Sequence, residues 1–172
     1  GAYLLLIDEA HNLVDRARQN FSAALSCTPL REAVALLPPA GDAARLMNKL
    51  IRGMQQLRQT CLPANHLASK APMVNFNRLV GKLIDALDEW LARQAEPAPD
   101  ALMAVYFDLL RWQRTAEVYD TRYITLIETD GGESTAQQLC LDPSARLQGT
   151  LDRVKAAVFF SATLSPMNYY ID

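Results

Sequence analysis

YLLLIDEAH at residues 3–11 places an unbroken apolar run directly before the tetrapeptide Asp-Glu-Ala-His. A short apolar run that ends in acidic residues indicates a buried strand that delivers carboxylates to one edge of a sheet. A second apolar run, at residues 156–160, ends at Ser161, Ala162 and Thr163. The two runs share one construction, and most of the chain lies between them.

Amphipathic helical patterns fill most of the segment between the two runs. Apolar residues recur there at three- and four-residue steps, and breaks rich in proline separate them. The most regular stripes are Leu46, Met47, Leu50, Ile51, Met54, Leu57 and Cys61, then Phe76, Leu79, Val80, Leu83, Ile84, Leu87 and Leu91, then Leu102, Val105, Tyr106, Leu109 and Leu110. We predict about four to five helices between residues 12 and 119, packed as a bundle.

Other stretches have different patterns. The apolar spacing of residues 13–25 predicts a further helix, whereas residues 62–72, with two prolines and several polar residues, indicate a linker. Residues 123–129 are rich in β-branched and aromatic side chains, and an Asp-Gly-Gly turn follows them. Residues 137–141 can return as a second strand, so we predict a β-hairpin, and then a helix that starts near Pro143.

Composition excludes several classes of protein. The chain has 172 residues, a charged fraction of 21% and a net charge of −2, which is not the composition of a basic nucleic-acid-binding module. Its three cysteines lie far apart without a Cys-x-x-Cys spacing, so we expect neither a disulfide framework nor a zinc site. No apolar run reaches about 18 residues, so we expect no membrane span. A basic n-region is lacking, so we expect no signal peptide and a cytoplasmic location.

The two apolar runs and their endings carry a resemblance. Asp-Glu-Ala-His after an apolar strand resembles the Walker B element, or motif II, of superfamily 2 helicases, and Ser-Ala-Thr after such a strand resembles their motif III. A mainly helical insertion between these motifs is similar to the arch domain of the XPD/DinG branch of DNA helicases. The sequence FFSATLSP at residues 159–166 also resembles that branch.

The resemblance implies a mainly α fold, in which a helical, arch-like bundle is inserted between parallel strands of a partial RecA-like α/β domain. Residues 1–12 would hold the motor-domain strand with motif II, and residues 13–119 the helical insertion. Residues 120–172 would return to the motor domain with a hairpin, a helix and the motif III strand. Parallel strands need a long crossover connection, nearly always right-handed, and the insertion would grow out of it.

The resemblance also assigns roles to residues at the ends of the two strands, where open α/β sheets bind ligands. Asp8 would hold Mg²⁺, a hard cation that takes carboxylate oxygens, and Glu9 would orient and deprotonate the attacking water. His11 would sense the state of the nucleotide. Ser161 and Thr163 would couple ATP hydrolysis to DNA unwinding.

DNA contacts are expected on the helical insertion, because single strands are bound by basic grooves with aromatic platforms. Two segments pair tryptophan with arginine, and the candidate residues in them are Trp90, Arg93, Arg111, Trp112 and Arg114. Further basic residues lie off the apolar stripes, namely Lys49, Arg52, Arg58, Arg78 and Lys82. A solvated helix face also explains most of these side chains.

A helicase of this branch needs further elements that this sequence does not contain. The sequence has no Gly-x-x-x-x-Gly-Lys-Ser/Thr phosphate loop, no second motor domain and no four-cysteine iron–sulfur element. We therefore expect a fragment of a longer, bacterial, nucleoid-associated helicase that uses Mg²⁺ and ATP, and in this branch often a 4Fe–4S cluster outside this segment. Such a protein translocates 5′ to 3′ on single-stranded or forked DNA in DNA repair or the damage response. The isolated chain should be inactive.

Other interpretations of the same residues remain open. Asp8 and Glu9 could begin a helix, where acidic residues suit the first turn, and Ser161 or Thr163 could cap one. The main functional alternative is a non-catalytic helical protein-interaction module with degenerate motor motifs. A zinc hydrolase that uses His11 would need a His-Glu-x-x-His or a comparable ligand cluster, which the sequence lacks.

Overall fold

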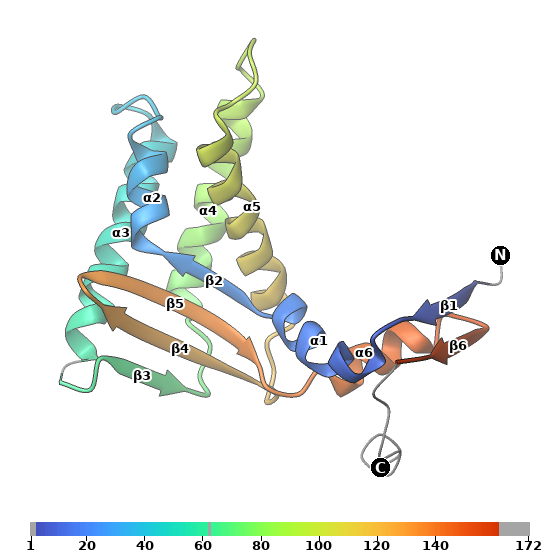
Figure 1. Cartoon of the computed structure of the whole chain (residues 1–172). Coiled ribbons are helices and arrows are strands. Elements are labelled where there is room, and N and C mark those ends of the chain that lie inside the picture. The colour runs from blue at the N-terminus through green and yellow to red at the C-terminus, as the bar shows by residue number, and fades with distance from the viewer. Residues whose placement is uncertain (1–2, 62, 162–172) are drawn as a thin grey trace. The chain divides into compact units, whose positions relative to one another are not determined.

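The computed structural model describes residues 3–61 and 63–161 (Figure 1). The chain divides into two compact units, of which the first combines residues 1–21 with residues 140–172 and the second comprises residues 22–139. The second unit is thus inserted into the first. Among the described residues, no helix is long and apolar enough to cross a membrane.

The first unit is built on a parallel pair of strands. β1 (Leu4–Ile7) pairs with β6 (Ala156–Phe159) in parallel, with Leu4 opposite Ala156 and Ile7 opposite Phe159. The short 3₁₀ turn η1 (Ala10–Asn12) and helix α1 (Leu13–Phe21) follow β1, and α6 (Ser144–Leu151) precedes β6. The parallel pairing of these two runs, about 150 residues apart, agrees with the prediction.

The prediction that these strands are buried is wrong for the described structure. Leu4 and Leu6 are 71% and 70% exposed, and Val158 is 52% exposed. A buried parallel strand needs a covering layer on each face of its sheet, and the described residues do not provide these layers. β1 and β6 are therefore more apolar than is usual for strands with this much exposed surface.

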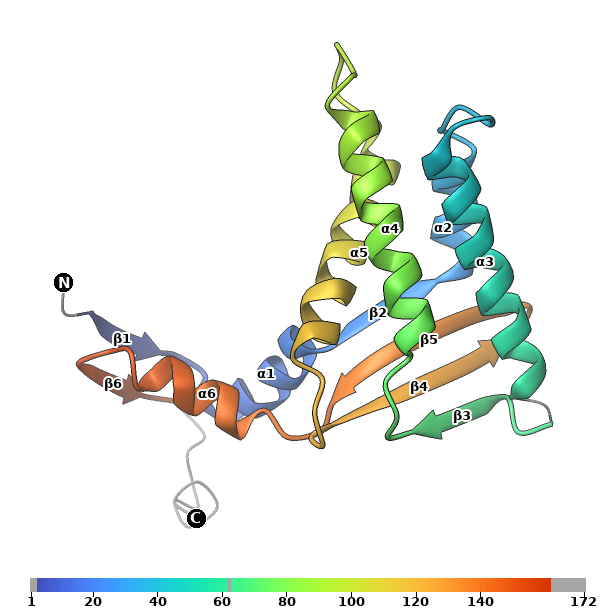
Figure 2. The ribbon, with the colours of Figure 1, turned by 180° about the vertical axis from the view of Figure 1, so that it is seen from behind.

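The second unit is an antiparallel sheet with helices on one face (Figures 1 and 2). The strand order is β2-β5-β4-β3, with β2 at Ala23–Ser26, β3 at His66–Ser69, β4 at Tyr123–Asp130 and β5 at Glu133–Cys140. The helices are α2 (Cys27–Val34), α3 (Asp42–Thr60), α4 (Val74–Leu91) and α5 (Asp100–Glu117). The unit is therefore a helical layer on a sheet rather than a bundle alone.

The predicted helical stripes form the core of the second unit. The largest fully buried apolar side chains are Trp112, Tyr123, Leu30, Met47, Leu50, Met54, Leu83, Leu87, Leu102, Leu109 and Val80. All but Leu30 and Tyr123 come from α3, α4 and α5, and of these all but Trp112 belong to the predicted stripes, so the three-and-four spacing identified most of the faces that pack together. Cys27 and Cys61 are buried, and neither forms a disulfide.

The predicted hairpin is present, although its second strand starts earlier, at Glu133. Gly131 and Gly132 form the two-residue connection, and their φ angles are 52° and 97°. Two successive positive φ angles are the requirement of a type I′ turn, which glycine meets without strain. The earlier start follows from this turn, because a two-residue loop pairs Asp130 directly with Glu133.

Two segments were predicted incorrectly. Residues 23–25 were included in a helix but belong to the strand β2, with Ala23 opposite Gln138. The predicted linker at residues 62–72 contains the edge strand β3, with His66 opposite Glu128. Both strands have four residues, too few to show a period of their own, and they form because the hairpin offers them free edges.

The hairpin also explains a difference in domain limits. The predicted insertion ended at residue 119, and the compact unit ends at residue 139. The hairpin lies in this unit because β5 pairs with β2 and β4 pairs with β3. It is therefore the platform on which the helices pack.

The hairpin also caps helix α2. Glu133 accepts hydrogen bonds from the backbone nitrogen of Thr28 at 3.1 Å and from its hydroxyl, and the backbone nitrogen of Ser134 lies 3.2 Å away. Burial alone would raise the pKa of Glu133, but the hydrogen bonds from Thr28, Ser134 and the backbone of Cys27 outweigh it, so that the pKa lies below the ordinary value of 4.5. The carboxylate satisfies helix N–H groups that would otherwise lack a partner.

Replacing this carboxylate should make the free energy of unfolding of the second unit depend less on pH in the acidic range. Because folding lowers the pKa of Glu133, its stabilisation is present above pH 4.5 and is lost as the pH falls through the folded-state pKa. We expect Glu133→Ala to lower the free energy of unfolding by about 1 kcal/mol at pH 7, the usual value of an N-cap. Urea titrations at pH 7 and pH 3 measure this difference, which should shrink in acid. Glu32→Ala, an exposed glutamate of α2, is the matched control, and an equal loss there would contradict the cap.

Candidate functional site

The site predicted from the sequence lies at the carboxyl ends of β1 and β6. Two backbone hydrogen bonds join the strands beyond their paired residues. The nitrogen of Phe160 donates to the carbonyl of Ile7 at 3.0 Å, and the nitrogen of Ala10 donates to the carbonyl of Phe160 at 3.1 Å. Residues that follow β1 and β6 are thereby held in fixed register to each other.

Glu9 bends the chain sharply at the end of β1. Its φ and ψ are 53° and 43°, the left-handed conformation, which is uncommon for a residue other than glycine. Its backbone nitrogen donates to Oδ1 of Asp8 at 2.7 Å. Adjacent residues of a strand point to opposite faces, and this turn releases Asp8 and Glu9 from that alternation. Backbone strain of this kind occurs preferentially at functional sites.

Three side chains from both strands meet next to this turn. Nδ1 of His11 lies 2.6 Å from Oγ of Ser161 and 3.2 Å from Oε2 of Glu9. Oγ of Ser161 lies 3.5 Å from the same glutamate oxygen. With the proton on Nδ1, His11 donates to Ser161, and the serine hydroxyl donates on to Glu9. The cluster connects the predicted motif II and motif III residues across 150 positions of sequence.

This cluster does not have the geometry of a nucleophilic triad. In a Ser-His-acid triad, one ring nitrogen of histidine takes the serine proton while the other is oriented by the acid. Here Ser161 and Glu9 approach the same nitrogen, Nδ1 of His11. The arrangement suits the transmission of a positional change between the strands better than the activation of Ser161.

Most of the predicted residues of the two motifs lie close together. Asp8, Glu9, His11 and Ser161 lie together at one end of the parallel pair. Thr163, the second coupling residue, and Ala162 lie outside the described residues. Asp8 and Glu9 are exposed, so solvent can reach both side chains.

The chemistry of Asp8 fits the predicted Mg²⁺ ligand. Nucleotide-bound Mg²⁺ is usually held by one or two protein carboxylates, with water and phosphate oxygens as the other ligands. An exposed aspartate at a strand end supplies such a ligand. Among residues 3–61 and 63–161 no cluster of three or more His, Cys, Asp or Glu side chains forms a complete metal cage. A cage is not required for a cation that arrives with a nucleotide.

The residues predicted to contact DNA lie apart in the second unit. Trp90, half-buried, and Arg93 line a cavity between α3 and α4, where Arg93 pairs with Glu89 at 3.3 Å. Arg111 and Arg114 are exposed on α5, and Arg111 lines a different cavity next to β2.

Trp112 requires a correction, because it has no exposed surface on which a base could stack. Its side chain is 0% exposed and tilts against Phe76, with ring centroids 5.2 Å apart. Its Nε1 donates to Oδ1 of Asn77 at 2.9 Å. Trp112 is a core residue, and we remove it from the set of candidate DNA contacts.

Sequence reasoning missed how the off-stripe basic residues are combined. Lys49 and Arg52 of α3 and Arg78 and Lys82 of α4 line one common cavity. Their spacings of three and four residues predict that each pair shares a helix face. The pairing of α3 with α4 is tertiary information that no single helix contains.

Comparison with known proteins adds no family. No family model matches the chain, and no curated protein matches it either.

Proposed function

We propose that the chain is the segment of an ATP-dependent DNA helicase of the XPD/DinG type that runs from motif II to motif III. In this proposal the first unit belongs to a RecA-like motor domain, and the second unit is the arch-like insertion. Asp8 and Glu9 serve Mg²⁺-dependent ATP hydrolysis, and Ser161 and Thr163 couple it to translocation on single-stranded DNA.

The observation that carries the proposal is the contact of 2.6 Å between His11 and Ser161. The motif resemblance requires that the residues after the two strands meet, although 150 positions separate them. Random apolar runs of this composition have no reason to pair in parallel, in register, with the polar residues at the same end. Their meeting supports a shared site at the carboxyl edge of a sheet.

The exposed strands give independent support. Parallel sheets occur almost only with both faces covered, and an isolated pair of strands is marginally stable in water. Leu4, Leu6 and Val158 are exposed on β1 and β6 in this chain. Further strands and helices of a motor domain would provide the missing cover.

The roles of the residues follow from what phosphoryl transfer requires. The reaction proceeds mainly through positioning and charge neutralisation, which a bound Mg²⁺ assists at the phosphates. Asp8 would hold the cation, and Glu9 would orient the attacking water and accept its proton. Glu9 contacts both His11 and Ser161, so a change at this carboxylate is passed directly to the residues after β6.

The test is ATP hydrolysis by the full-length protein that, on this proposal, contains the chain. We expect single-stranded DNA to stimulate turnover, and Ser161→Ala to lower this stimulation more than the rate without DNA, because the link between His11 and β6 is cut. Thr150→Ala, another hydroxyl of the first unit, is the control and should leave the stimulation unchanged. A full-length protein without turnover in the presence or absence of DNA would favour the non-catalytic interaction module.

The isolated chain provides a second check. Because it lacks a phosphate loop, we expect it to hydrolyse no ATP by itself. Metal-dependent turnover by the isolated chain that disappears in Glu9→Gln would contradict the proposed division of the motor.

A further inference from the structure

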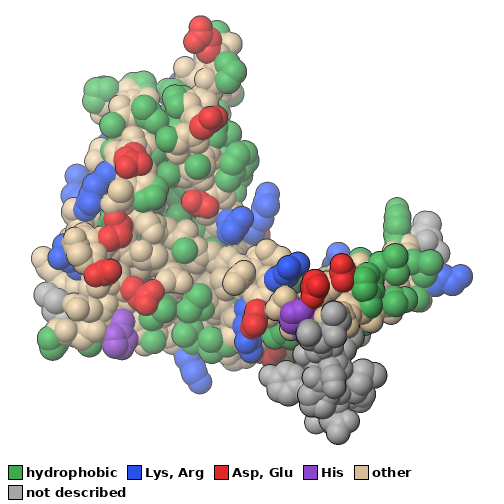
Figure 3. All heavy atoms as spheres, in the orientation of Figure 1, with side chains coloured by type: hydrophobic (Ala, Val, Ile, Leu, Met, Phe, Trp, Pro, Cys, Tyr) green, Lys and Arg blue, Asp and Glu red, His purple; other side chains and the backbone are tan. Residues whose placement is uncertain are grey.

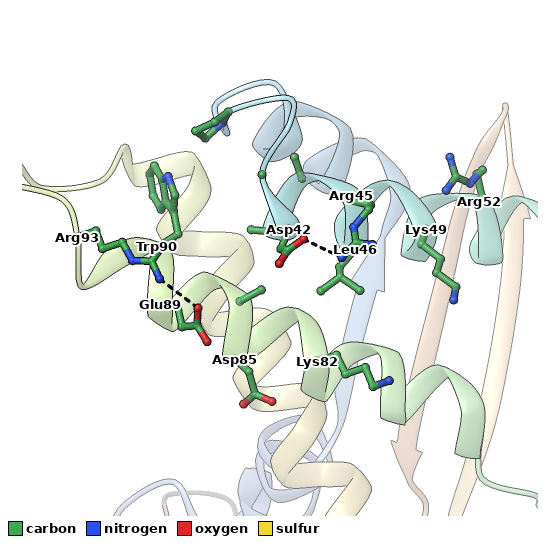
Figure 4. A pocket seen from close by; sticks show the side chains of 15 residues that line it. Asp42, Arg45, Leu46, Lys49, Arg52, Lys82, Asp85, Glu89, Trp90 and Arg93 are labelled. Carbon is green, nitrogen blue, oxygen red and sulfur yellow. Dashed lines mark hydrogen bonds and ion pairs between the residues drawn. The ribbon is translucent and has the colours of Figure 1, made fainter.

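A groove runs between α3 and α4 in the second unit, which are the nearest helices in Figure 2. It consists of two adjoining cavities of about 610 and 890 Å³ that share Lys49, Arg52 and Lys82 as lining residues. Figure 4 shows Lys49 extending from α3 toward α4, and Lys82 running along α4. The larger cavity is nearer the sheet, and the smaller one is nearer the loops at the far ends of the helices.

The larger cavity is lined by cationic side chains without an acidic one. Lys49 and Arg52 come from α3, and Arg78 and Lys82 come from α4. Within the described parts of the chain, no acidic side chain lies within ion-pair distance of any of the four. The nearest polar contact is that of Arg78 with Oδ1 of Asn75 at 3.5 Å.

The smaller cavity has a different charge balance. Asp42 pairs with Arg45 at 2.7 Å and Glu89 pairs with Arg93 at 3.3 Å, as the dashed lines in Figure 4 show. These cations are therefore neutralised within their own helices. A third acidic residue, Asp85, also lines the smaller cavity. Lys49, Arg52 and Lys82 therefore have acidic residues in the lining on one side only, and towards the sheet they share with Arg78 a lining that holds none.

This concentration of charge is unusual for a chain with a net charge of −2. On the face drawn in Figure 3, acidic and basic side chains are scattered together over the helices of the second unit. Like charges three or four residues apart destabilise a helix, and a concave site between two helices brings both pairs together. An arrangement that costs stability without a ligand points to a polyanion that neutralises it.

We propose that the groove between α3 and α4 binds the phosphodiester backbone of single-stranded DNA. The groove is a surface seam along two helices that pack directly against each other, and one flexible sugar–phosphate chain can lie along it with its phosphates facing the four cations. Apolar side chains, among them Leu57 and Met73, line the same cavity and offer contact to sugars and bases without sequence preference. The choice of DNA as the polyanion rests on the helicase proposal, whereas the affinity for a phosphate chain rests on the four cations.

The experiment measures binding of a fluorescent oligothymidylate to the whole chain by anisotropy, without nucleotide, at several salt concentrations. If the four cations each neutralise one phosphate, affinity falls about 50-fold between 50 and 200 mM salt, a slope near −2.8. In the double variant Arg52→Gln with Lys82→Gln, two contacts are lost, and the same change in salt should lower affinity only about 7-fold.

Matched variants keep the test specific. Arg31→Gln with Lys70→Gln removes the same charge from exposed positions outside the groove and should leave affinity and slope near those of the wild type. Lys49→Gln with Arg78→Gln should reproduce the effect of the first pair from the other groove positions. Circular dichroism establishes that each variant is folded, which is expected because all these side chains are exposed.

Three results would overturn the proposal. They are equal losses in the groove and control pairs, equal affinity for duplex DNA, and equal affinity for poly-glutamate of the same charge. None of these depends on ATP hydrolysis, so the groove can fail while the motor assignment stands. Conversely, the full-length protein could bind DNA through the groove and yet hydrolyse no ATP. That result would support the DNA-binding groove and contradict the helicase proposal.

Discussion

Glu9→Gln is expected to lower DNA-stimulated ATP hydrolysis of the full-length protein by about 10²- to 10⁴-fold, the usual contribution of a general base. The amide has nearly the same shape as the carboxylate but cannot accept the proton of the attacking water. Asp8, the proposed Mg²⁺ ligand, is unchanged, so we expect ATP to bind with little loss. Turnover in the presence of excess DNA, together with a fluorescent ATP analogue for binding, measures the two effects separately.

The matched control for this variant is Asp15→Asn. Asp15 is an exposed acidic residue of α1 in the same unit, and it pairs with Arg18 at 3.3 Å rather than with His11 or Ser161. It should retain turnover close to that of the wild type. If Glu9→Gln also retained turnover, the left-handed turn at Glu9 would be a local structural feature and the assignment of the base would be wrong.

Trp112→Ala should cause the largest loss of stability, about 3–5 kcal/mol in the free energy of unfolding. The side chain is fully buried between α4 and α5 and contacts the ring of Phe76. Truncation leaves a large cavity and also removes the donor to Asn77, whose amide oxygen then keeps only the bond from Gln138 at 3.3 Å. Urea unfolding followed by far-ultraviolet circular dichroism measures this loss.

Two further variants separate packing from hydrogen bonding at this position. Trp112→Phe keeps most of the apolar contact but loses the bond to Asn77, so it should cost less than Trp112→Ala. Trp90→Ala, at the half-buried tryptophan of the same unit, should lower the free energy of unfolding clearly less than Trp112→Ala does. A loss below about 1 kcal/mol for Trp112→Ala would show that Trp112 is not buried in solution.

The sequence predicted what depends on local periodicity. The stripe that begins at Phe76 and continues through Val80 and Leu83 identified the buried face of α4, because a helix repeats every 3.6 residues whatever it packs against. The parallel pairing of β1 with β6 was predicted from a different signal, the polar residues at the ends of both apolar runs, which resemble two motifs of one site. His11 and Ser161 meet as that resemblance required.

The features that were missed depend on partners distant in sequence. Ala23 is in a strand only because Gln138 pairs with it, and the apolar spacing around it is equally compatible with a helix. The cap of α2 could not be found from the residues around Thr28, because the accepting carboxylate comes from Glu133, more than 100 residues away. The burial of Trp112 depends on the neighbouring helix that supplies Phe76 and Asn77.

The pairing of β2 with β5 has a consequence for the order in which the chain folds. Closing a loop costs about (3/2)RT ln n, and the paired strands β1 and β6 are separated by about 150 residues. Once the second unit has folded, Ala23 lies opposite Gln138, and only about 40 flexible residues still separate β1 from β6. Prior folding of the insertion therefore shortens the search for the parallel pair and reduces its entropic cost by about 1 kcal/mol. Folding of the insertion shortens the chain between the two halves of the interrupted unit, so mutations that slow its folding should also delay the pairing of β1 with β6.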